Sequence, residues 1–132
     1  MELSNLNIKN GLCISLGANI DSKFGSPADS LILCKGKVEN IIKDWINQIF
    51  ITEKETNITK PQFIWSSIYK TAPHGVKTQQ PNYFNTLVLI KSDFFPNPST
   101  ENAKSLLKEL KNLESFFGRQ KHQKIKNGYL DV

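Results

Sequence analysis

The stretch QPNYFNTLVLI, residues 80–90, passes from a polar loop into a strand that is predicted to begin at Tyr83. Because side chains alternate along a strand with period two, Tyr83 and Asn85 are expected on one face and Phe84 on the other. The apolar run at residues 87–90 is typical of a half-buried strand. We expect this strand to pair antiparallel with residues 63–71, FIWSSIYKT, which are rich in aromatic and β-branched side chains.

A strand and a helix are predicted ahead of this pair. LCISL at residues 12–16 indicates a short buried strand. Ser26 followed by Pro27 favours the start of a helix, with serine as N-cap and proline at the first helical position. That helix is predicted to run to about residue 49, and its apolar stripe consists of Leu31, Val38, Ile42, Trp45 and Ile49.

A second helix and a last strand are predicted after it. Ser99 or Thr100 is the expected N-cap, and Gly118 is the expected C′ residue. The apolar stripe of this helix consists of Ala103, Leu106, Leu107, Leu110, Leu113 and Phe117. YLDV at residues 129–132 indicates the start of a further strand. The resulting order is β-α-β-β-α-β, the split pattern of a ferredoxin-like α+β sandwich with an antiparallel sheet.

Composition is that of one soluble globular domain over residues 1–132. Hydrophobic residues make up 39% and charged residues 22% of the 132, enough for a single ordinary core. No secretory signal is evident, and no window approaches the roughly 20 apolar residues of a membrane span. Cys13 and Cys34 show no metal-ligand spacing. We therefore expect a reduced, cytoplasmic chain.

The formal net charge is +5, and part of it is concentrated after the second helix. Residues 118–127 contain no acid, and their basic residues are Arg119, Lys121, Lys124 and Lys126. This segment could bind the phosphates of a nucleotide or of nucleic acid, or it could be a solvated basic loop. Charge alone does not separate these alternatives.

A group of polar side chains is predicted where the two paired strands meet a long loop. Thr71 ends one strand, and Tyr83 and Asn85 begin the next, so antiparallel pairing should bring the three together. An aromatic face beside a carboxamide suits a flat heteroaromatic ligand, because the ring stacks while the amide offers a donor and an acceptor. The alternative is a core tyrosine with Asn85 bonded to the loop backbone.

Two acidic residues are also candidates. Glu114 lies on or beside the apolar stripe of the second helix. It is either a carboxylate that reaches water at the edge of the stripe or one held to accept a hydrogen bond from a ligand. Asp131, on the predicted last strand beside the basic segment, suits Mg²⁺ that holds a polyphosphate.

An RNA-binding module with the RRM fold shares the order of elements and the basic character. An RRM needs stacking aromatic residues in the middle of its first and third strands. LCISL has none, and NYFNTLVLI lacks the glycine-aromatic pattern, so this alternative is disfavoured.

In order along the chain, SLGANI, SSIYKTAPHG, QPNYFNTLVLI, LKNLESFFGRQKH and LDV resemble the 6-hydroxymethyl-7,8-dihydropterin pyrophosphokinase family of folate biosynthesis. The resemblance implies Mg²⁺-dependent transfer of pyrophosphate from ATP to the pterin hydroxymethyl group, with release of AMP. The implied partners are pterin and ATP, without nucleic acid or membrane. The implied protein is a monomer that could be fused to other folate enzymes.

The resemblance also implies roles for individual residues. The residues implied to form the pterin pocket are Thr71, Ala72, His74, Gly75, Tyr83 and Asn85. Glu114 would lie on the nucleotide side, and Arg119 and Lys121 would be the catalytic basic residues of a loop that closes over the phosphates. Asp131 matches the first of two aspartates that bind two magnesium ions.

The chain also departs from the family pattern. Where the family has RWGPRTLDLDI, this chain reads KIKNGYLDV, so Ile125 stands at the position of a ring-stacking Trp and Gly128 at that of a phosphate-binding Arg. Ala72 replaces a proline. The second aspartate and the family's C-terminal part would lie beyond Val132, so we expect either a C-terminally truncated fragment or a short, non-catalytic binding relative. Severe loss of turnover is the expectation for the chain as given, even where pterin binds.

Overall fold

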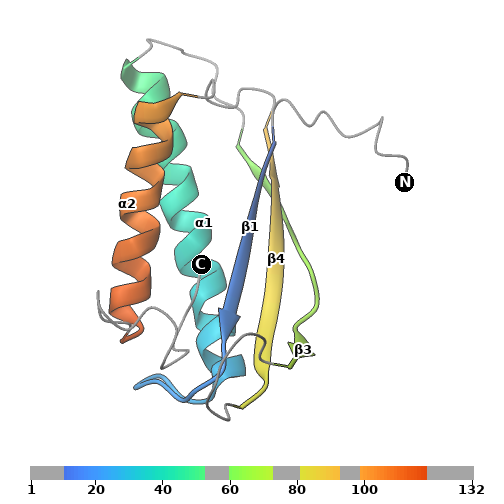
Figure 1. Cartoon of the computed structure of the whole chain (residues 1–132). Coiled ribbons are helices and arrows are strands. Elements are labelled where there is room, and N and C mark those ends of the chain that lie inside the picture. The colour runs from blue at the N-terminus through green and yellow to red at the C-terminus, as the bar shows by residue number, and fades with distance from the viewer. Residues whose placement is uncertain (1–10, 53–59, 73–80, 93–98, 119–132) are drawn as a thin grey trace.

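The computed structural model describes residues 11–52, 60–72, 81–92 and 99–118. Its elements in chain order are β1 (Gly11–Ala18), α1 (Pro27–Thr52), β2 (Gln62–Trp65), β3 (Tyr69–Thr71), β4 (Tyr83–Lys91) and α2 (Thr100–Phe116). Both helices lie on the same side of an open antiparallel sheet (Figure 1). This arrangement confirms the predicted ferredoxin-like α+β class. The strand predicted at residues 129–132 falls outside the described residues.

β4 is the strand on which the described sheet is built. It pairs antiparallel with β1 on one side and with β2 and β3 on the other. The predicted pairing of residues 83–90 with residues 63–71 is therefore confirmed. The partner strand, however, is not continuous, because Ser66, Ser67 and Ile68 separate β2 from β3.

The two faces of the sheet differ in burial. Toward the helices, β1 and β4 place fully buried residues such as Leu16, Val88 and Ile90, which join one hydrophobic cluster with both helices. On the opposite face, Ile64 and Leu87 are exposed. We call this second side the outer face of the sheet.

α1 begins as predicted. Ser26 Oγ accepts a hydrogen bond from the Asp29 backbone N–H at 3.2 Å, and Asp29 Oδ2 accepts one from the Ser26 N–H at 3.1 Å. This reciprocal pair satisfies two amides at the helix start. Of the predicted apolar stripe, Leu31, Val38, Ile42 and Trp45 are buried and Ile49 is partly buried. The helix continues to Thr52, three residues beyond the predicted end. Neither this helix nor α2, the two helices described, is apolar enough over a sufficient length to cross a membrane.

α2 has the predicted caps. Ser99 is the N-cap, and its Oγ accepts a hydrogen bond from the Asn102 N–H at 3.1 Å. Gly118, just after the C-cap, has a φ of 103°, a conformation that glycine adopts without a steric cost. The burial of Leu106, Leu113 and Phe117 agrees with the predicted stripe, but Ala103 is exposed and Leu107 is 54% exposed. Leu107 follows Leu106 by one residue and is turned about 100° from it around the helix axis.

Side chains of both tryptophans fix α1 against its neighbours. Trp45 Nε1 donates to the backbone oxygen of Asn102 in α2 at 3.1 Å. Trp65 Nε1, from β2, donates to Glu39 Oε2 at 3.0 Å. Each bond satisfies the indole N–H next to the core, so these large rings pack without leaving a buried donor unbonded.

Candidate functional site

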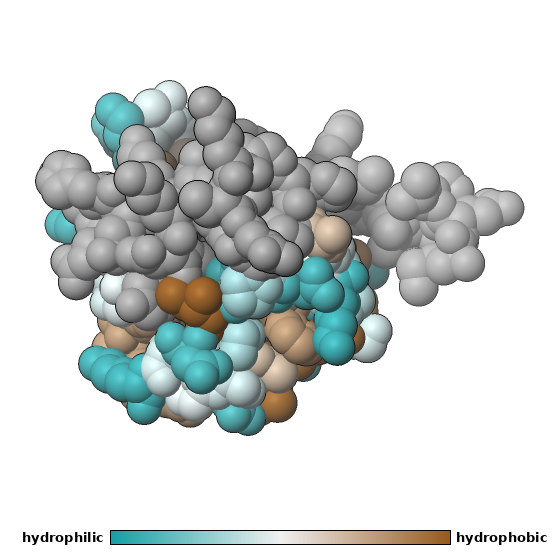
Figure 2. Space-filling view, turned by 60° about the horizontal axis from the view of Figure 1, so that its bottom comes forward, coloured by the Kyte–Doolittle hydropathy of each residue, from teal (hydrophilic) through white to brown (hydrophobic). Residues whose placement is uncertain are grey.

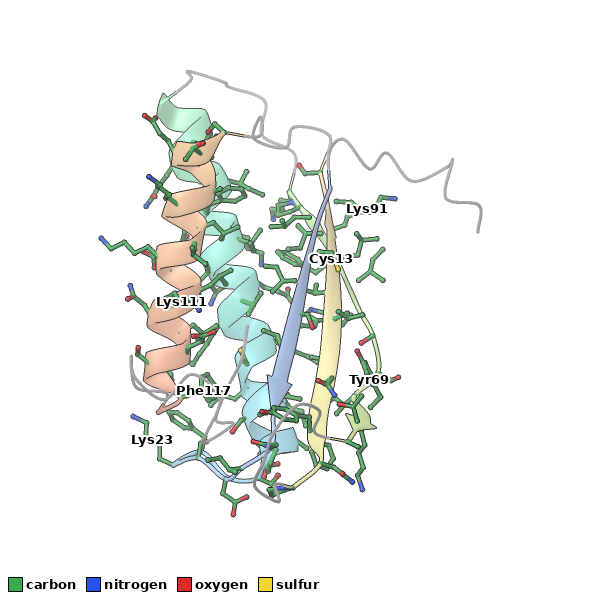
Figure 3. The ribbon with its side chains drawn as sticks, viewed as in Figure 1. Cys13, Lys23, Tyr69, Lys91, Lys111 and Phe117 are labelled. Atoms are coloured by element: carbon green, nitrogen blue, oxygen red, sulfur yellow. The ribbon has the colours of Figure 1, made fainter. Side chains whose placement is uncertain are left out.

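The outer face brings together three of the predicted pocket residues. The register pairs Thr71 with Tyr83 and Tyr69 with Asn85, and paired residues project from the same face. Phe84 lies on the helix side, where it packs against the core. Figure 3 shows Tyr69 pointing away from the helices. The predicted alternation along β4 is therefore present, and Thr71, Tyr83 and Asn85 share one surface.

A hydrogen bond ties two of these residues together. Asn85 Nδ2 donates to Thr71 Oγ1 at 2.8 Å and lies 3.5 Å from the backbone oxygen of Tyr69. Both bonds place the amide nitrogen toward β3, so the amide oxygen points toward β1. The carboxamide thus has a fixed orientation across three strands.

Gly17 of β1 makes room for that oxygen. It pairs with Asn85, and a Cβ atom built on it would lie 3.0 Å from Asn85 Oδ1 and 3.7 Å from Tyr83 Cδ1. A Cβ atom at this distance is closer than an ordinary van der Waals contact, so a larger residue would require the Asn85 amide to shift. The strand predicted from LCISL ended at residue 16, before Gly17, so this role was not predicted; β1 continues to Ala18.

The remaining members of the predicted pocket are only partly described. Ala72 follows β3 and is exposed. His74 and Gly75 fall outside the described residues, as do Arg119, Lys121 and Asp131. Within the described ranges, no group of three or more His, Cys, Asp or Glu could hold a metal ion. The predicted catalytic and magnesium-binding residues therefore stay predictions.

Glu114 is buried. It is 5% exposed near the end of α2, and its Oε2 lies 3.4 Å from Lys111 Nζ. Lys111 is itself largely exposed, so this ion pair contributes little to stability. Of the two interpretations of Glu114, burial favours a carboxylate that is held in place over one at a wet edge. A role toward nucleotide stays a prediction.

An aromatic cluster that sequence reasoning missed lies at the end of α2. The ring centres of Phe24 and Phe116 are 5.0 Å apart with an interplanar angle of 22°, and Phe117 meets Phe24 edge-on at 5.1 Å. Lys23 Nζ is 5.1 Å from both stacked rings, and Lys37 Nζ is 4.4 Å from that of Phe116. Figure 3 shows Lys23 beside Phe117. In the sequence, this cluster is visible only as the pair Phe116 and Phe117 directly before Gly118 and as a single Phe24 far from that pair.

A cavity of about 410 Å³ lies on the other side of β3 and β4 from Asn85. Its lining residues are Asn19, Ile20, Asp21, Pro27, Lys70, Pro81, Asn82 and Phe84. Asn19 Nδ2 donates to the Pro81 oxygen at 3.3 Å, which ties the end of β1 to the approach to β4. Figure 2 shows this end of the molecule, where hydrophobic residues lie between hydrophilic ones. Among the described members of the predicted pterin pocket, Thr71, Tyr83 and Asn85 do not line this cavity, so it lies apart from that described part of the pocket.

The two thiols occupy different environments. Cys13 is exposed on β1, whereas Cys34 is fully buried in α1. Burial raises the pKa of Cys34 to about 12, against a smaller opposing effect of Lys37. A thiol that stays protonated at neutral pH is a poor nucleophile, so Cys34 has the properties of a core residue.

Comparison with known proteins assigns this chain to a family. The family model described as 7,8-dihydro-6-hydroxymethylpterin-pyrophosphokinase (HPPK) matches residues 13–132. A search among curated proteins found no match. The matched range begins within β1 and covers nearly the whole chain, including every residue of the candidate site.

Proposed function

Since this chain belongs to the 7,8-dihydro-6-hydroxymethylpterin-pyrophosphokinase family, whose members act in folate biosynthesis, we propose that it binds 6-hydroxymethyl-7,8-dihydropterin and ATP and transfers a pyrophosphoryl group between them. One observation carries the pterin part of this proposal. It is the grouping of Thr71, Tyr83 and Asn85 on the outer face, with the Asn85 amide held by Thr71.

The pterin ring fits the chemistry of that grouping. Asn85 Nδ2 donates to Thr71 Oγ1 at 2.8 Å and makes only a long contact of 3.5 Å with the Tyr69 oxygen. In the proposal, a pterin takes the place of that long contact, so that Nδ2 and Oδ1 pair with the donor and acceptor edge of the ring. The ring of Tyr83 offers a stacking surface on the same face. Ala72, His74 and Gly75 complete the proposed wall from the loop that follows β3. An amide with a preset orientation loses little entropy when it binds such a ring.

The proposed reaction is a displacement at phosphorus. The hydroxymethyl oxygen of the pterin attacks the β-phosphorus of ATP, the bond from that phosphorus to the α–β bridging oxygen breaks, and AMP leaves. The hydroxyl proton is released. The protein mainly has to align the two ligands and offset phosphate charge, which is how phosphoryl transfer is generally catalysed.

The charge-handling residues in the proposal come from the second half of the chain. Arg119 and Lys121 are proposed to contact the phosphates, and Glu114 to accept a hydrogen bond on the nucleotide side. Asp131 is proposed to contribute to magnesium binding, and the ions would supply charge neutralisation on the phosphate oxygens. Burial of Glu114 supports a fixed position for its carboxylate.

Formation of AMP tests the proposal directly. The protein is incubated with ATP, Mg²⁺ and 6-hydroxymethyl-7,8-dihydropterin, and AMP is measured by chromatography with and without the pterin. AMP that appears only with pterin supports the proposed reaction. Failure of a chain that carries the second aspartate to form AMP overturns it. If that chain still binds pterin in calorimetry, the outcome identifies a non-catalytic pterin-binding relative.

A further inference from the structure

The register of the sheet changes between β2 and β3. Trp65 pairs with Val88, and Tyr69 pairs with Asn85, so three residues on one side face two on β4. One extra residue in a strand is a β-bulge. Burial agrees with this, since Trp65 and Ile68 both pack against the core although they are three residues apart. A regular strand would turn one of them to the outer face.

This extra residue decides which side chains reach the candidate site. With the register of β2 continued, Ile68 would lie opposite Asn85, and Lys70 opposite Tyr83. The shifted register instead places Tyr69 and Thr71 at those positions. The Asn85 amide therefore finds the Thr71 hydroxyl as its partner, at 2.8 Å, because of the bulge.

Two hydroxyl groups replace the backbone bond that the bulge removes. In a regular antiparallel pair, Ser66 and Leu87 would exchange two backbone hydrogen bonds. Only the bond from the Ser66 N–H to the Leu87 oxygen, at 2.8 Å, has this form. The Leu87 N–H donates to Ser66 Oγ at 2.9 Å, and Thr86 Oγ1 donates to the Ser66 oxygen at 3.1 Å. Thr86 is fully buried, so this pairing satisfies polar groups that water cannot reach.

We propose that Ser66 and Thr86 are positioning residues for the pterin pocket: their hydroxyl groups stabilise the bulge that sets Thr71 beside Asn85. The two side chains also lie 3.2 Å from each other, oxygen to oxygen. Neither contacts the ligand in this proposal. Thr86 is buried toward the helices, and the Ser66 hydroxyl is bonded to the Leu87 amide and to Thr86. The inference rests on the proposed function only for the identity of the ligand, and the register it explains is independent of that function.

The test combines two variants that each remove one hydroxyl with two matched controls. Ser66→Ala removes the acceptor of the Leu87 amide, and Thr86→Val removes the buried donor at nearly constant shape. Thr86→Ser keeps the hydroxyl, and Ser67→Ala changes the exposed residue next to the network. Backbone NOEs across β3 and β4 report the register, and calorimetry reports the dissociation constants of 6-hydroxymethyl-7,8-dihydropterin and ATP.

In the unmodified chain and both controls, NOEs should join Tyr69 to Asn85 and Thr71 to Tyr83. In Ser66→Ala and Thr86→Val, these NOEs should weaken, and the pterin dissociation constant should rise about tenfold while that of ATP is unchanged, because each variant leaves one polar group of the bulge unbonded. Unchanged NOEs and pterin affinity in both variants overturn the proposal, as does an equal loss of affinity for both ligands. If the unmodified chain binds no pterin, the proposed function fails, whereas the NOEs of the variants still decide the role of the two hydroxyls.

Discussion

Asn85 Nδ2 lies 2.8 Å from Thr71 Oγ1, and this bond joins two neighbouring antiparallel strands on the outer face of the sheet. The amide plane is therefore set before any ligand arrives. Gly17 on β1, the neighbour of β4 on its other side, leaves space for the amide oxygen. A carboxamide held in this orientation can select a ring by its pattern of donors and acceptors.

Substitution of Asn85 should separate recognition from strand pairing. Asn85→Ala is expected to raise the pterin dissociation constant at least about tenfold in calorimetry, with ATP affinity retained, because it removes the donor and the acceptor together. Asn85→Asp provides the sharper comparison. Thr71 can still donate to the carboxylate, so the strand contact persists while the donor toward the ring is lost. Equal losses for pterin and ATP would show that Asn85 is structural.

Two glycines with opposite surroundings make a matched pair for substitution by alanine. At Gly17 the new Cβ would meet Asn85 Oδ1 at 3.0 Å, so Gly17→Ala should displace the amide, weaken pterin binding and destabilise the fold by about 1–3 kcal/mol. At Gly36, within α1, a Cβ meets nothing within 4 Å. Gly36→Ala should stabilise the fold by about 0.5–1 kcal/mol. Urea denaturation measures both, and a neutral Gly17→Ala would contradict the close approach.

Glu114 should affect nucleotide binding more than pterin binding. Glu114→Gln preserves the shape of a side chain that is 5% exposed and removes its charge. We expect the ATP dissociation constant to rise about tenfold, the scale of a hydrogen bond to a charged group, with no change for pterin. Glu109→Gln, on an exposed position of the same helix, is the control. ATP affinity that is equal in both variants would leave Glu114 with a structural role only.

The two cysteines should differ in their reaction with thiol reagents. The reaction is run at about pH 7.5, roughly one unit below the ordinary thiol pKa. Cys13 should be alkylated in the native protein, and Cys34 only after denaturation. Mass spectrometry of the alkylated chain counts the modified thiols, and Cys34→Ala confirms the assignment. Rapid alkylation of both thiols in the native protein would contradict this prediction, because it would show that the reagent reaches Cys34.

The same burial predicts a pH dependence of stability. The pKa of Cys34 is about 12 in the folded protein, raised from 9.0 by burial. Above pH 9 the unfolded chain releases this proton and the folded chain keeps it, so the free energy of unfolding should fall as the pH rises toward 12. Denaturation at several pH values should show this decline, and it should be smaller in Cys34→Ala.

The sequence predicted those parts of the fold that depend on local signals. The caps at Ser26 and Ser99, the αL glycine at Gly118 and the alternation along β4 are each specified by a few neighbouring residues. The split between β2 and β3 was not predicted. Ser66 and Ser67 interrupt the aromatic and β-branched residues of FIWSSIYKT, but the bulge itself depends on Thr86, which lies 20 residues from Ser66. Propensity does not record such a partner.

The candidate site was predictable where pairing of strands alone determines it. Thr71, Tyr83 and Asn85 were expected together because antiparallel neighbours meet at their ends, and the structure places them on one face. The contribution of Gly17 was not predictable, since a missing side chain matters only when the atom that takes its place is known. The Phe24 and Phe116 stack likewise joins segments that are far apart in the chain.

All the described strands pair through β4, and β4 is the last of them to be synthesised. A nascent chain that has emerged as far as β3 but not β4 carries three strands, β1, β2 and β3, none of which has its partner. The sheet can assemble only after β4 has left the exit tunnel, so β1, β2 and β3 stay unpaired until then. Nascent chains of this protein should therefore be substrates for ribosome-associated chaperones until β4 emerges.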